Sequence, residues 1–399
     1  MLQFLTAGES HGPQLTTILE GFPAGFPIDI GKINFQLSRR QKGYGRGGRM
    51  KIENDRAKIL SGVRNGITLG GPITLVIENK DWPNWQKIMD PIEPIAADLS
   101  LKEKRLAYET TAPRPGHADL SGAIKWNQQD MRNVLERASA RETAARVAVC
   151  SIPRQLLEKF GVKFAAHVVQ IADVKLEAGY DISDLDKIIE TTENSEVRCL
   201  ELKTEERMIA AIRAAKKSRD SVGGVAELII RGLPAGLGSF SQWNNRLDAG
   251  LAQAMVSIQS VKGVEIGRGF ENAGLRGSKV HDEIYYEPGS DKKKKDFYRK
   301  TNNAGGLEGG ITNGEDVIIR VASKPISTLN QPLKTVDVKT KKQVEAMVER
   351  TDNCVVPALS VICEAMAAYV ICRAFLEKFG CDNMTEIERN FASYLDSPL

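Results

Sequence analysis

The chain has 399 residues, of which 42% are hydrophobic and 27% are charged, a composition typical of a soluble globular protein. Its 55 basic and 51 acidic residues give a net charge of +4, so any anion must be bound by local clusters of cations and not by a global field. No apolar run approaches the ~20 residues of a membrane span. The first residues, MLQFLTAGESHG, lack the basic and apolar segments of a signal peptide, so we expect a cytoplasmic protein. Length alone favours two or three domains.

The six cysteines include no CxxC pair, which argues against structural zinc. Cys354, Cys363, Cys372 and Cys381 are spaced by nine residues. At ~100° per residue, nine steps place consecutive members on opposite faces of a helix, so neighbours in this series cannot share one metal ion. We expect the cysteines to be small buried side chains in a reducing cytosol, and we expect no metal.

The first half of the chain mixes strands and helices. The hydrophobic pattern predicts a strand at Leu15–Glu20, a short helix at Ile33–Arg40, and strands or hairpin arms within Ile67–Glu78. Ser139 and Glu142 then fit a capping box at the start of an alanine-rich helix. A helix N-terminus surrounded by arginines is a natural anion site, although most capping boxes simply start helices.

The second half begins with an amphipathic helix at Thr204–Lys217. Val222–Leu233 and Glu315–Ala322 are typical of buried strands, and Val355–Phe379 is the longest helical pattern, apolar enough to be buried. Lys292–Lys295 follows a Pro-Gly-Ser turn, and we interpret it as a solvated loop. No linker and no 20–50-residue repeat marks a domain boundary.

A glycine-rich basic stretch, SRRQKGYGRGGRMKIE, satisfies the GxGxxG pattern with Gly43, Gly45 and Gly48. The dinucleotide-binding interpretation fails because a basic helix precedes the glycines, where that motif requires a strand, and a charged segment follows them. The stretch does present several guanidinium groups, which bind phosphate or carboxylate oxygens two at a time. These belong to Arg39, Arg40, Arg46 and Arg49. A solvated basic loop explains this segment equally well when it is taken alone.

Further short segments carry histidine, arginine, lysine or hydroxyl groups in turns. They are GESHG at 8–12, RPGHAD at 114–119, RASARET at 137–143, KPIST at 324–328 and RTD at 350–352. Each is weak alone, because a single histidine in a turn is usually just a hydrogen-bonded polar residue. In this order, and with DSVGG at 220–224, VKGVEIG at 261–267 and GGLEGGITNG at 305–314, they resemble the landmarks of the chorismate synthase family. The resemblance extends from residue 6 to about residue 375.

The resemblance implies an α+β fold in which one intertwined domain, residues 1–399, holds helices sandwiched between antiparallel sheets. This expectation replaces the estimate of several domains. It also implies an anti 1,4-elimination that converts 5-enolpyruvylshikimate 3-phosphate to chorismate and phosphate. Reduced FMN is required in this family but not consumed, and NADPH serves only as a possible reductant. A cytoplasmic homotetramer is expected, with no nucleic acid and no membrane as partner.

The resemblance also implies site residues. His11 is the acid at the leaving phosphate, His117 lies against the flavin, and Asp352 helps the flavin N5 to act as base. Ser10 and Ser139 relay protons. Substrate binding is implied for Arg40, Arg46, Arg49, Arg114, Arg141 and Arg350. FMN contacts are implied for Arg137, Ala138, Ser139, Gln259, Ser260, Gly309, Lys324, Pro325, Ile326, Ser327, Thr328 and Arg350.

The reaction accounts for these residue types. The substrate carries two carboxylates and a phosphate, and FMN adds another phosphate, so one pocket needs several arginines. This favours the anion-binding interpretation of the glycine-arginine stretch. The sequence departs from the family at Thr351, which keeps a hydroxyl, at Gln259 and Ser260, which replace an Asn-Ala pair, and at Gly250. Glycine at position 250, inside the helical pattern Leu247–Met255, costs ~1 kcal/mol of helix propensity.

Two other function classes remain open from the residues. A flavin oxidoreductase that transfers hydride would consume nicotinamide stoichiometrically, whereas chorismate synthase needs only catalytic reduced flavin. A non-enzymatic nucleic-acid-binding protein would bind DNA or RNA in a salt-sensitive manner, and the nearly balanced charge argues against it.

Overall fold

The computed structural model describes residues 1–47, 54–95, 97–100, 103–104, 107–177, 179–349 and 351–397. Two antiparallel sheets dominate the described chain. The first has the order β1-β2-β6-β3, with β1 (Gln3–Ala7), β2 (Gln14–Glu20), β3 (Ala57–Ile59) and β6 (Ile73–Glu78). The second has the order β10-β15-β9-β7-β8, with β7 (Lys163–Ile171), β8 (Val174–Lys175), β9 (Gly224–Arg231), β10 (Val261–Ile266) and β15 (Val317–Ser323).

Short hairpins and helices complete the described elements. The hairpins are β4 (Val63–Arg64) with β5 (Ile67–Thr68), β11 (Ile284–Tyr286) with β12 (Phe297–Arg299), β13 (Leu307–Glu308) with β14 (Ile311–Thr312), and β16 (Lys334–Val336) with β17 (Gln343–Glu345). The α-helices are α1 (Ile30–Gln41), α2 (Gln86–Met89), α4 (Asp119–Trp126), α5 (Arg132–Ala138), α6 (Thr143–Lys159), α7 (Leu185–Asn194), α8 (Leu202–Lys217), α9 (Leu247–Val256), α10 (Gly277–Val280), α11 (Val356–Phe379) and α12 (Met384–Asp396). The 3-10 turns are η2 (Trp82–Asn84), η3 (Ala140–Glu142), η4 (Trp243–Asn245), η5 (Gly269–Gly274) and η6 (Lys292–Lys294).

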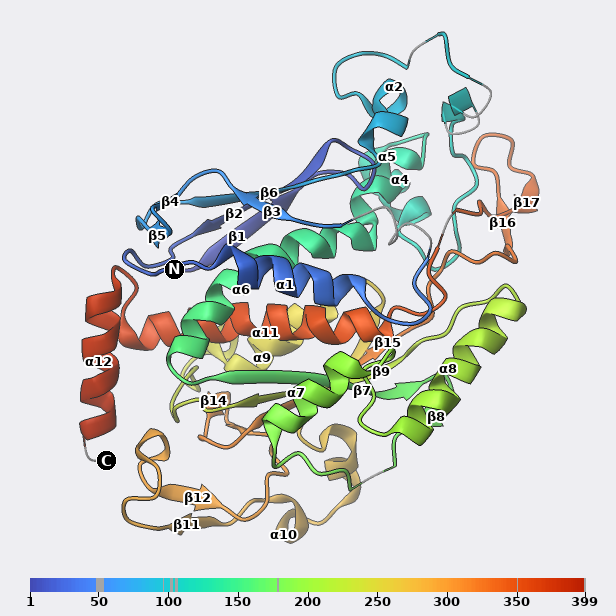
Figure 1. Ribbon diagram of the computed structural model, residues 1–399. Helices are drawn as coiled ribbons and strands as arrows, with labels where there is room; N and C mark the ends of the chain where they lie inside the picture. The colour runs from blue at the N-terminus through green and yellow to red at the C-terminus, as the bar shows by residue number, and fades with distance from the viewer. Residues whose placement is uncertain are drawn as a thin grey trace.

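Helices α1, α6 and α11 form a layer between the two sheets (Figure 1). Helix α6 packs against β2 and β6 above it, and α11 packs against β7 and β9 below it. The strands follow the period of two that this position requires: in β2, Leu15, Thr17 and Leu19 are buried in alternation with more exposed residues. The main hydrophobic core therefore lies where helices and both sheets meet.

Helix α11 is apolar on all sides because it is covered on all sides. A helix with this pattern is either a core helix or a membrane span. Among the described residues, α11 is the one helix long and apolar enough to cross a membrane, and 83% of its most apolar stretch is buried inside the protein. Its composition is therefore explained by its place in the helix layer.

The structure confirms the predicted α+β class and the predicted regular elements. The predicted strand at Leu15–Glu20 is β2, and the predicted helix at Ile33–Arg40 is the longer α1. The remaining predicted elements in the described chain correspond to β5 and β6, α6, α8, β9, α9, β15 and α11. The helix α1 that precedes the GxGxxG match confirms the reason for rejecting a dinucleotide-binding motif.

Two sequence predictions on the surface are wrong. The lysine run is not simply a solvated loop: Lys293 Nζ donates to the carbonyls of Phe160 and Gly232, and Lys294 Nζ lies 2.7 Å from Glu315. These lysines satisfy backbone oxygens and a carboxylate at the end of the second sheet. Among the free cysteines, Cys381 is exposed in the turn before α12, whereas the other five are buried as predicted.

Gly250 is explained by close helix packing. Helix α9 lies against α11, and a Cβ atom at position 250 would lie 3.3 Å from Val370 Cγ1. A larger side chain at this position would push the two helices apart. The cost in helix propensity is therefore offset by a closer contact between α9 and α11.

A buried charge cluster joins the helix layer. Glu364 of α11 is fully buried, and its carboxylate accepts hydrogen bonds from Arg39 of α1 and Arg154 of α6, each at 2.5 Å. Burial raises the pKa of this carboxyl, but the arginines outweigh burial and lower it to about 2. Glu364 is therefore ionised at neutral pH and holds three helices together through charged hydrogen bonds.

Candidate active site

The GESHG segment forms the tight connection between β1 and β2. Gly8 has φ +106°, and a Cβ atom there would lie 2.4 Å from the carbonyl oxygen of Gln14, so the turn requires glycine. Asn79, directly after β6, donates from Nδ2 to the carbonyls of Glu9 and Gly12 at 3.2 and 2.7 Å. The loop that presents His11 is therefore held in place by the neighbouring strand.

His11 is tied to helix α5 and to an indole. Its Nδ1 lies 2.9 Å from Glu136 Oε1, and its backbone N–H donates to Glu136 Oε2 at 2.8 Å. The imidazole stacks on Trp85 with ring centroids 4.0 Å apart and an angle of 29° between the planes. Burial raises the pKa of Glu136, but the hydrogen bond and charge of His11, with the charge of Arg132, outweigh burial and lower it.

Ser10 and Ser139 meet beside this histidine. Ser139 Oγ donates to Ser10 Oγ at 3.2 Å and accepts the backbone N–H of Arg141 at 3.2 Å, so it caps η3 and the start of α6. The second half of the predicted capping box is wrong. The Glu142 carboxylate bonds to Thr6, Arg146 and Gln259 and does not turn back to Ser139.

Two of the predicted substrate arginines, Arg40 and Arg141, are buried around Asp55. Both carboxylate oxygens of Asp55 lie 2.7 Å from Arg141 Nη1, and Arg40 Nη1 lies 3.7 Å from Asp55. Arg141 also donates to Asn79 Oδ1 at 2.9 and 3.1 Å, so Asn79 orients this arginine as well as the GESHG loop. Arg40 Nε donates to Thr143 at 2.9 Å. The carboxylate of Asp55 fixes the two guanidinium groups in one place before any ligand binds.

A second histidine–carboxylate pair lies at the start of α4. His117 Nδ1 lies 2.5 Å from Asp119 Oδ1, and Arg114 donates to both Asp119 oxygens at 2.8 and 3.0 Å. Arg114 Nη1 also donates to Thr328 Oγ1 at 2.9 Å. Asp119 therefore orients His117 and Arg114 together.

The segment Lys324–Thr328 follows β15 and lies against the turn that carries Arg114 and Gly116. Lys324 Nζ donates to the carbonyl of Gly116 at 3.1 Å, and the carbonyl of Ile326 accepts from Ser221 at 2.7 Å. Pro325 and Ser327 lie in the same segment, and Ser327 Cβ is within van der Waals distance of a Cβ built on Gly116. Burial and the charge of Lys262 lower the pKa of Lys324.

Arg46 and Asp352 form a further pair in the same region. Arg46 Nη1 lies 3.0 Å from Asp352 Oδ2, and Gly47 N–H donates to Asp352 Oδ1 at 2.5 Å. Thr351 lies against Gly47, since a Cβ atom at Gly47 would lie 2.8 Å from the carbonyl oxygen of Thr351. The predicted residues Arg49 and Arg350 lie outside the described residues.

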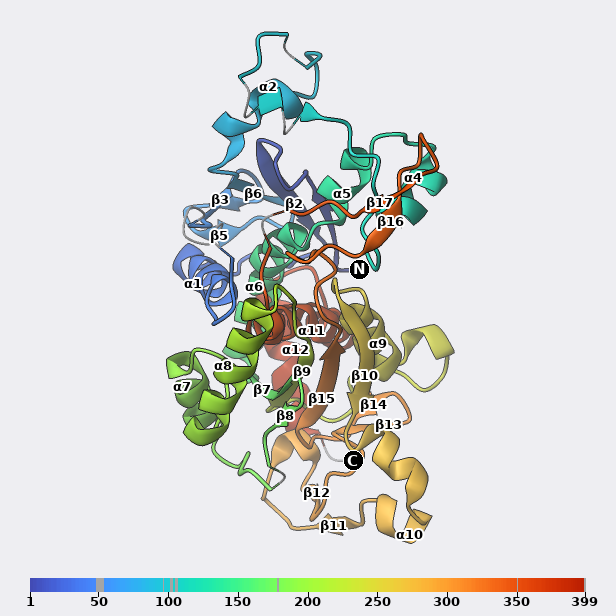
Figure 2. The ribbon, with the colours of Figure 1, turned by 90° about the vertical axis from the view of Figure 1, so that its right-hand side faces the viewer.

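Glu349 links the two histidine pairs. Its carboxylate lies 3.7 Å from Arg114 Nη1 and 3.9 Å from Arg132 Nη1, and Arg132 in turn donates to Glu136 at 3.2 Å. The hairpin β16–β17, which precedes Glu349, lies beside α4 and α5 in both views (Figures 1 and 2). Loops that are distant in sequence therefore meet at one end of the molecule.

Four of the predicted FMN contacts, Arg137, Gln259, Ser260 and Lys324, are connected by a series of hydrogen bonds. Arg137 donates to Thr6, Thr6 to Glu142 at 2.8 Å, and Gln259 to Glu142 at 3.1 Å. The next residue, Ser260, bonds through its carbonyl to Lys324 N–H at 2.9 Å. Ala138 is the last residue of α5, next to Ser139. Gly309 is the exception, because its hairpin β13–β14 lies on the opposite side of the helix layer from α5 (Figures 1 and 2).

These residues suit a flavin nucleotide. Within the described chain, the buried Gln259 Oε1 accepts no hydrogen bond, so an acceptor is available for a ligand N–H or O–H group. Arg137 and Lys324 supply cations for a phosphate, and Ser260 and Thr328 supply hydroxyl groups.

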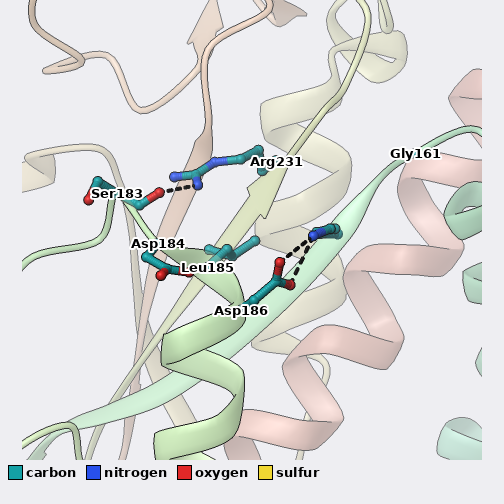
Figure 3. Close-up of a pocket in the computed structure, with 7 residues that line it drawn as sticks. Gly161, Ser183, Asp184, Leu185, Asp186 and Arg231 are labelled. Atoms are coloured by element: carbon teal, nitrogen blue, oxygen red, sulfur yellow. Dashed lines mark hydrogen bonds and ion pairs between the residues drawn. The ribbon is translucent and has the colours of Figure 1, made fainter.

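Two surface hollows lie elsewhere. One of about 360 Å³ is lined by Gly161, Lys163, Ser183, Asp184, Leu185, Asp186 and Arg231 (Figure 3), and one of about 410 Å³ adjoins it through Arg231. Arg231 ends the eight-residue strand β9, whereas Gly224, at the other end, pairs with Ser323 beside Lys324. Lys163 and Arg231 are already paired with Asp186 and Asp316 at 2.7 and 2.6 Å. The hollows are therefore not the candidate site.

Sequence reasoning missed Glu136, Trp85, Asp55 and Asn79. Glu136 is adjacent to the RASARET segment, and its position beside a candidate site was the one available signal. Asp55 stands two residues after the glycine-rich basic stretch and Asn79 directly follows β6, and neither has a local pattern that indicates its partner, so their roles depend on tertiary contacts. Asp119 was part of the RPGHAD segment, but it was given no role.

The loops at one end of this α+β fold bring together several arginines, a lysine and two histidine–carboxylate pairs. Such a site can bind an anionic ligand and transfer protons. The sequence model of the family described as chorismate synthase matches residues 2–376. The chain belongs to the chorismate synthase family. It is 53% identical over 393 residues to chorismate synthase of Brevibacillus brevis, with 98% of each chain covered. It is 51% identical over 389 residues to that of Bacillus subtilis, with 98% and 97% covered.

A solved structure described as a crystal structure of chorismate synthase is similar along 99% of this chain and 97% of its own, with a TM-score of 0.77 and 42% identity. These findings confirm the predicted family and enzyme class. The chain is a lyase of the shikimate pathway that acts on a small-molecule substrate, 5-enolpyruvylshikimate 3-phosphate, and forms chorismate and phosphate.

The pair of Asp119 with His117 and Arg114 should make stability depend on pH. Burial raises the pKa of Asp119, but hydrogen bonds and charge from His117 and Arg114 outweigh burial and hold it well below its ordinary value. A carboxylate with a depressed pKa stabilises the fold above the pKa of the unfolded chain, ~3.9, and this contribution is lost as pH falls below that value. We expect the free energy of unfolding, measured in urea, to fall between about pH 5 and pH 2. Asp119→Asn should show a smaller fall, and an equal fall would contradict this account.

Proposed function

We propose that the loops gathered around Glu349 form the active site, and that His11 donates the proton to the leaving phosphate. The observation that carries the proposal is the fixed position of His11, whose ring is held by Glu136 and Trp85 beside Ser10 and Ser139. Protonation makes phosphate a better leaving group, and histidine can hold that proton near neutral pH. Ser10 and Ser139, with their oxygens 3.2 Å apart, are proposed to pass protons within the site.

The substrate is proposed to bind among the arginines. Its two carboxylates and one phosphate need cations that are already oriented, and Arg40 and Arg141 are oriented by Asp55 and Asn79. Arg46 and Arg114 contribute from the neighbouring loops. Arg49 and Arg350 are proposed substrate-binding residues that lie outside the described residues.

Reduced FMN is the proposed cofactor, and when bound it supplies an electron-rich ring that can share charge with the substrate and accept a proton. Arg137, Gln259, Ser260 and Lys324 are proposed to hold it, supported by the hydrogen bonds that connect them, together with Ala138 and Ser139, which follow Arg137 in the chain. Pro325, Ile326, Ser327, Thr328 and Arg350 complete the proposed contacts, and Gly309 is left out because its hairpin lies across the helix layer from α5. His117, oriented by Asp119, and Asp352, held by Gly47, are proposed to face the ring.

The wider proposal is that residues 1–399 form one domain with the β-α-β sandwich of chorismate synthases. The main hydrophobic core, which draws on both sheets and the helix layer, supports it. We propose a cytoplasmic homotetramer without nucleic-acid or membrane partners, in which NADPH is at most a reductant for the flavin. Free cysteines fit a reducing compartment, and exposed Phe240, Trp243 and Phe270 fit contacts between subunits.

Replacing Arg46 by alanine should weaken substrate binding by about 1.5–3 kcal/mol, the range for hydrogen bonds to charged groups. The measurement is isothermal titration calorimetry with substrate in the presence of FMN. Arg213→Ala is the matched control, because this exposed arginine contacts Tyr44 of the same loop from outside the site. Equal substrate affinity in Arg46→Ala and wild type would remove Arg46 from the proposed site.

The proposed cofactor requirement is tested by an anaerobic assay with substrate and pre-reduced FMN. We expect chorismate and phosphate in equal amounts, with FMN needed only in catalytic quantity. Stoichiometric oxidation of a nicotinamide would instead favour a flavin oxidoreductase. A parallel aerobic assay with NADPH and oxidised FMN reports whether this chain reduces its own flavin.

A further inference from the structure

We propose that Glu136 is a positioning residue that makes Nε2 of His11 the nitrogen that delivers the proton, an inference that rests on the proposed role of His11. Glu136 belongs to α5 and is only 2% exposed. It lies 125 residues from His11 in the sequence, and nothing in the local pattern around GESHG indicates it.

Three donors converge on the Glu136 carboxylate. The backbone N–H of His11 donates to Oε2 at 2.8 Å, His11 Nδ1 lies 2.9 Å from Oε1, and Arg132 Nη1 donates to Oε1 at 3.2 Å. Each contact favours the ionised carboxylate, in agreement with the lowered pKa of Glu136. The carboxylate therefore holds both the loop and the ring of His11.

An ionised carboxylate can only accept hydrogen bonds. Nδ1 of His11 must therefore carry a proton whether the ring is neutral or cationic, and Nε2 is the nitrogen whose protonation changes. In the elimination, the C–O bond to phosphate breaks, its electron pair stays on the phosphate oxygen, and that oxygen takes the proton from Nε2. The resulting neutral ring is the Nδ1–H tautomer, which Glu136 stabilises.

The ring cannot easily turn over about its Cβ–Cγ bond. Trp85 stacks on one face at 4.0 Å, and the Arg132 guanidinium lies 5.2 Å from the Trp85 ring. A half-turn of the imidazole would also place a carbon atom against Glu136 and break its hydrogen bond. Glu136, Trp85 and Arg132 thus act as one support for a single ring orientation.

Replacement of Glu136 by glutamine tests this support. The carboxylate accepts from the backbone N–H at Oε2 and from Arg132 at Oε1, whereas an amide has one oxygen and one NH2 group. In one orientation of the amide its NH2 group faces the backbone N–H of His11, and in the other it faces Arg132. In both orientations the NH2 group can also donate a hydrogen bond to Nδ1 of His11, which then must be unprotonated. The variant should therefore mix the two neutral tautomers of His11.

The experiment is 15N NMR of the full chain labelled at its four histidines. It is recorded at a pH where the rings are neutral, and the His11 signals are assigned with His11→Asn. We expect the Nδ1–H tautomer in wild type and a mixture in Glu136→Gln. The elimination assay should show kcat lower by about 10–10³-fold with little change in KM, which is less than the ~10²–10⁴-fold contribution of general acid catalysis because some of the His11 rings still carry the proton on Nδ1.

Glu142→Gln is the matched NMR control, because Glu142 is a neighbouring buried carboxylate that bonds to Arg146 and Thr6 and not to His11. Its His11 signals should match wild type. An Nε2–H tautomer in wild type overturns the proposal, even if Glu136→Gln does not fold, and so does an unchanged tautomer in Glu136→Gln. If His11→Asn keeps full turnover while the tautomer result holds, the proposed role of His11 fails and the structural role of Glu136 stands.

Discussion

Replacing His11 by asparagine should lower kcat by about 10²–10⁴-fold, the usual contribution of general acid catalysis. The amide can replace one hydrogen bond to Glu136, so the GESHG loop should keep its position. It cannot carry a proton to the leaving phosphate. The measurement is the rate of chorismate formation with reduced FMN and substrate both saturating, so that altered binding does not contribute.

His281→Asn is the control for this substitution, because His281 is exposed and lies at the end of α10, away from the site. Its turnover should equal that of wild type. Turnover close to wild type in His11→Asn as well would remove His11 from the leaving-group step.

His117→Asn should also slow turnover, but through the flavin, so the absorption spectrum of bound reduced FMN should change in that variant and not in His11→Asn.

Replacing Glu364 by alanine should lower the free energy of unfolding by about 3–5 kcal/mol, the cost of breaking a buried ion pair. The variant leaves Arg39 and Arg154 buried in the helix layer without their shared carboxylate. Arg39 would keep Glu193 and Arg154 would keep Glu158, but the Nη groups that now face Glu364 would lose their charged acceptor inside the core. Urea unfolding at neutral pH measures the loss.

Glu158→Ala removes a different carboxylate from the same arginine. Glu158 Oε1 lies 2.9 Å from Arg154 Nε, and its side chain is 32% exposed, so solvent can replace it. We expect a loss of at most ~1 kcal/mol, as for other surface ion pairs. If the two variants lose equal stability, burial does not make the ion pairs of Glu364 more important to stability than the partly exposed pair of Glu158.

Features set by neighbouring residues could be predicted from the sequence, whereas features set by contacts between distant residues could not. The strand at β2 and the helices α8 and α11 could be predicted, because hydrophobic periodicity is a local property of each segment. The rejection of a dinucleotide-binding loop also depended only on neighbouring residues. The lysine run was misread, because its acceptors, the carbonyls of Phe160 and Gly232, are supplied by distant parts of the chain.

The sequence by itself determined the regular elements, the family and the residue types of the site, because each of these depends on segments that carry their own pattern. Only the tertiary structure decided which carboxylate accompanies each histidine or arginine: Glu136 for His11, Asp119 for His117 and Asp55 for Arg141. The residues around an aspartate or glutamate in the sequence do not show whether its carboxylate is exposed on the surface or buried in an ion pair. Its partner is set by which loops the two sheets and the helix layer bring together, and that information is spread over the whole chain.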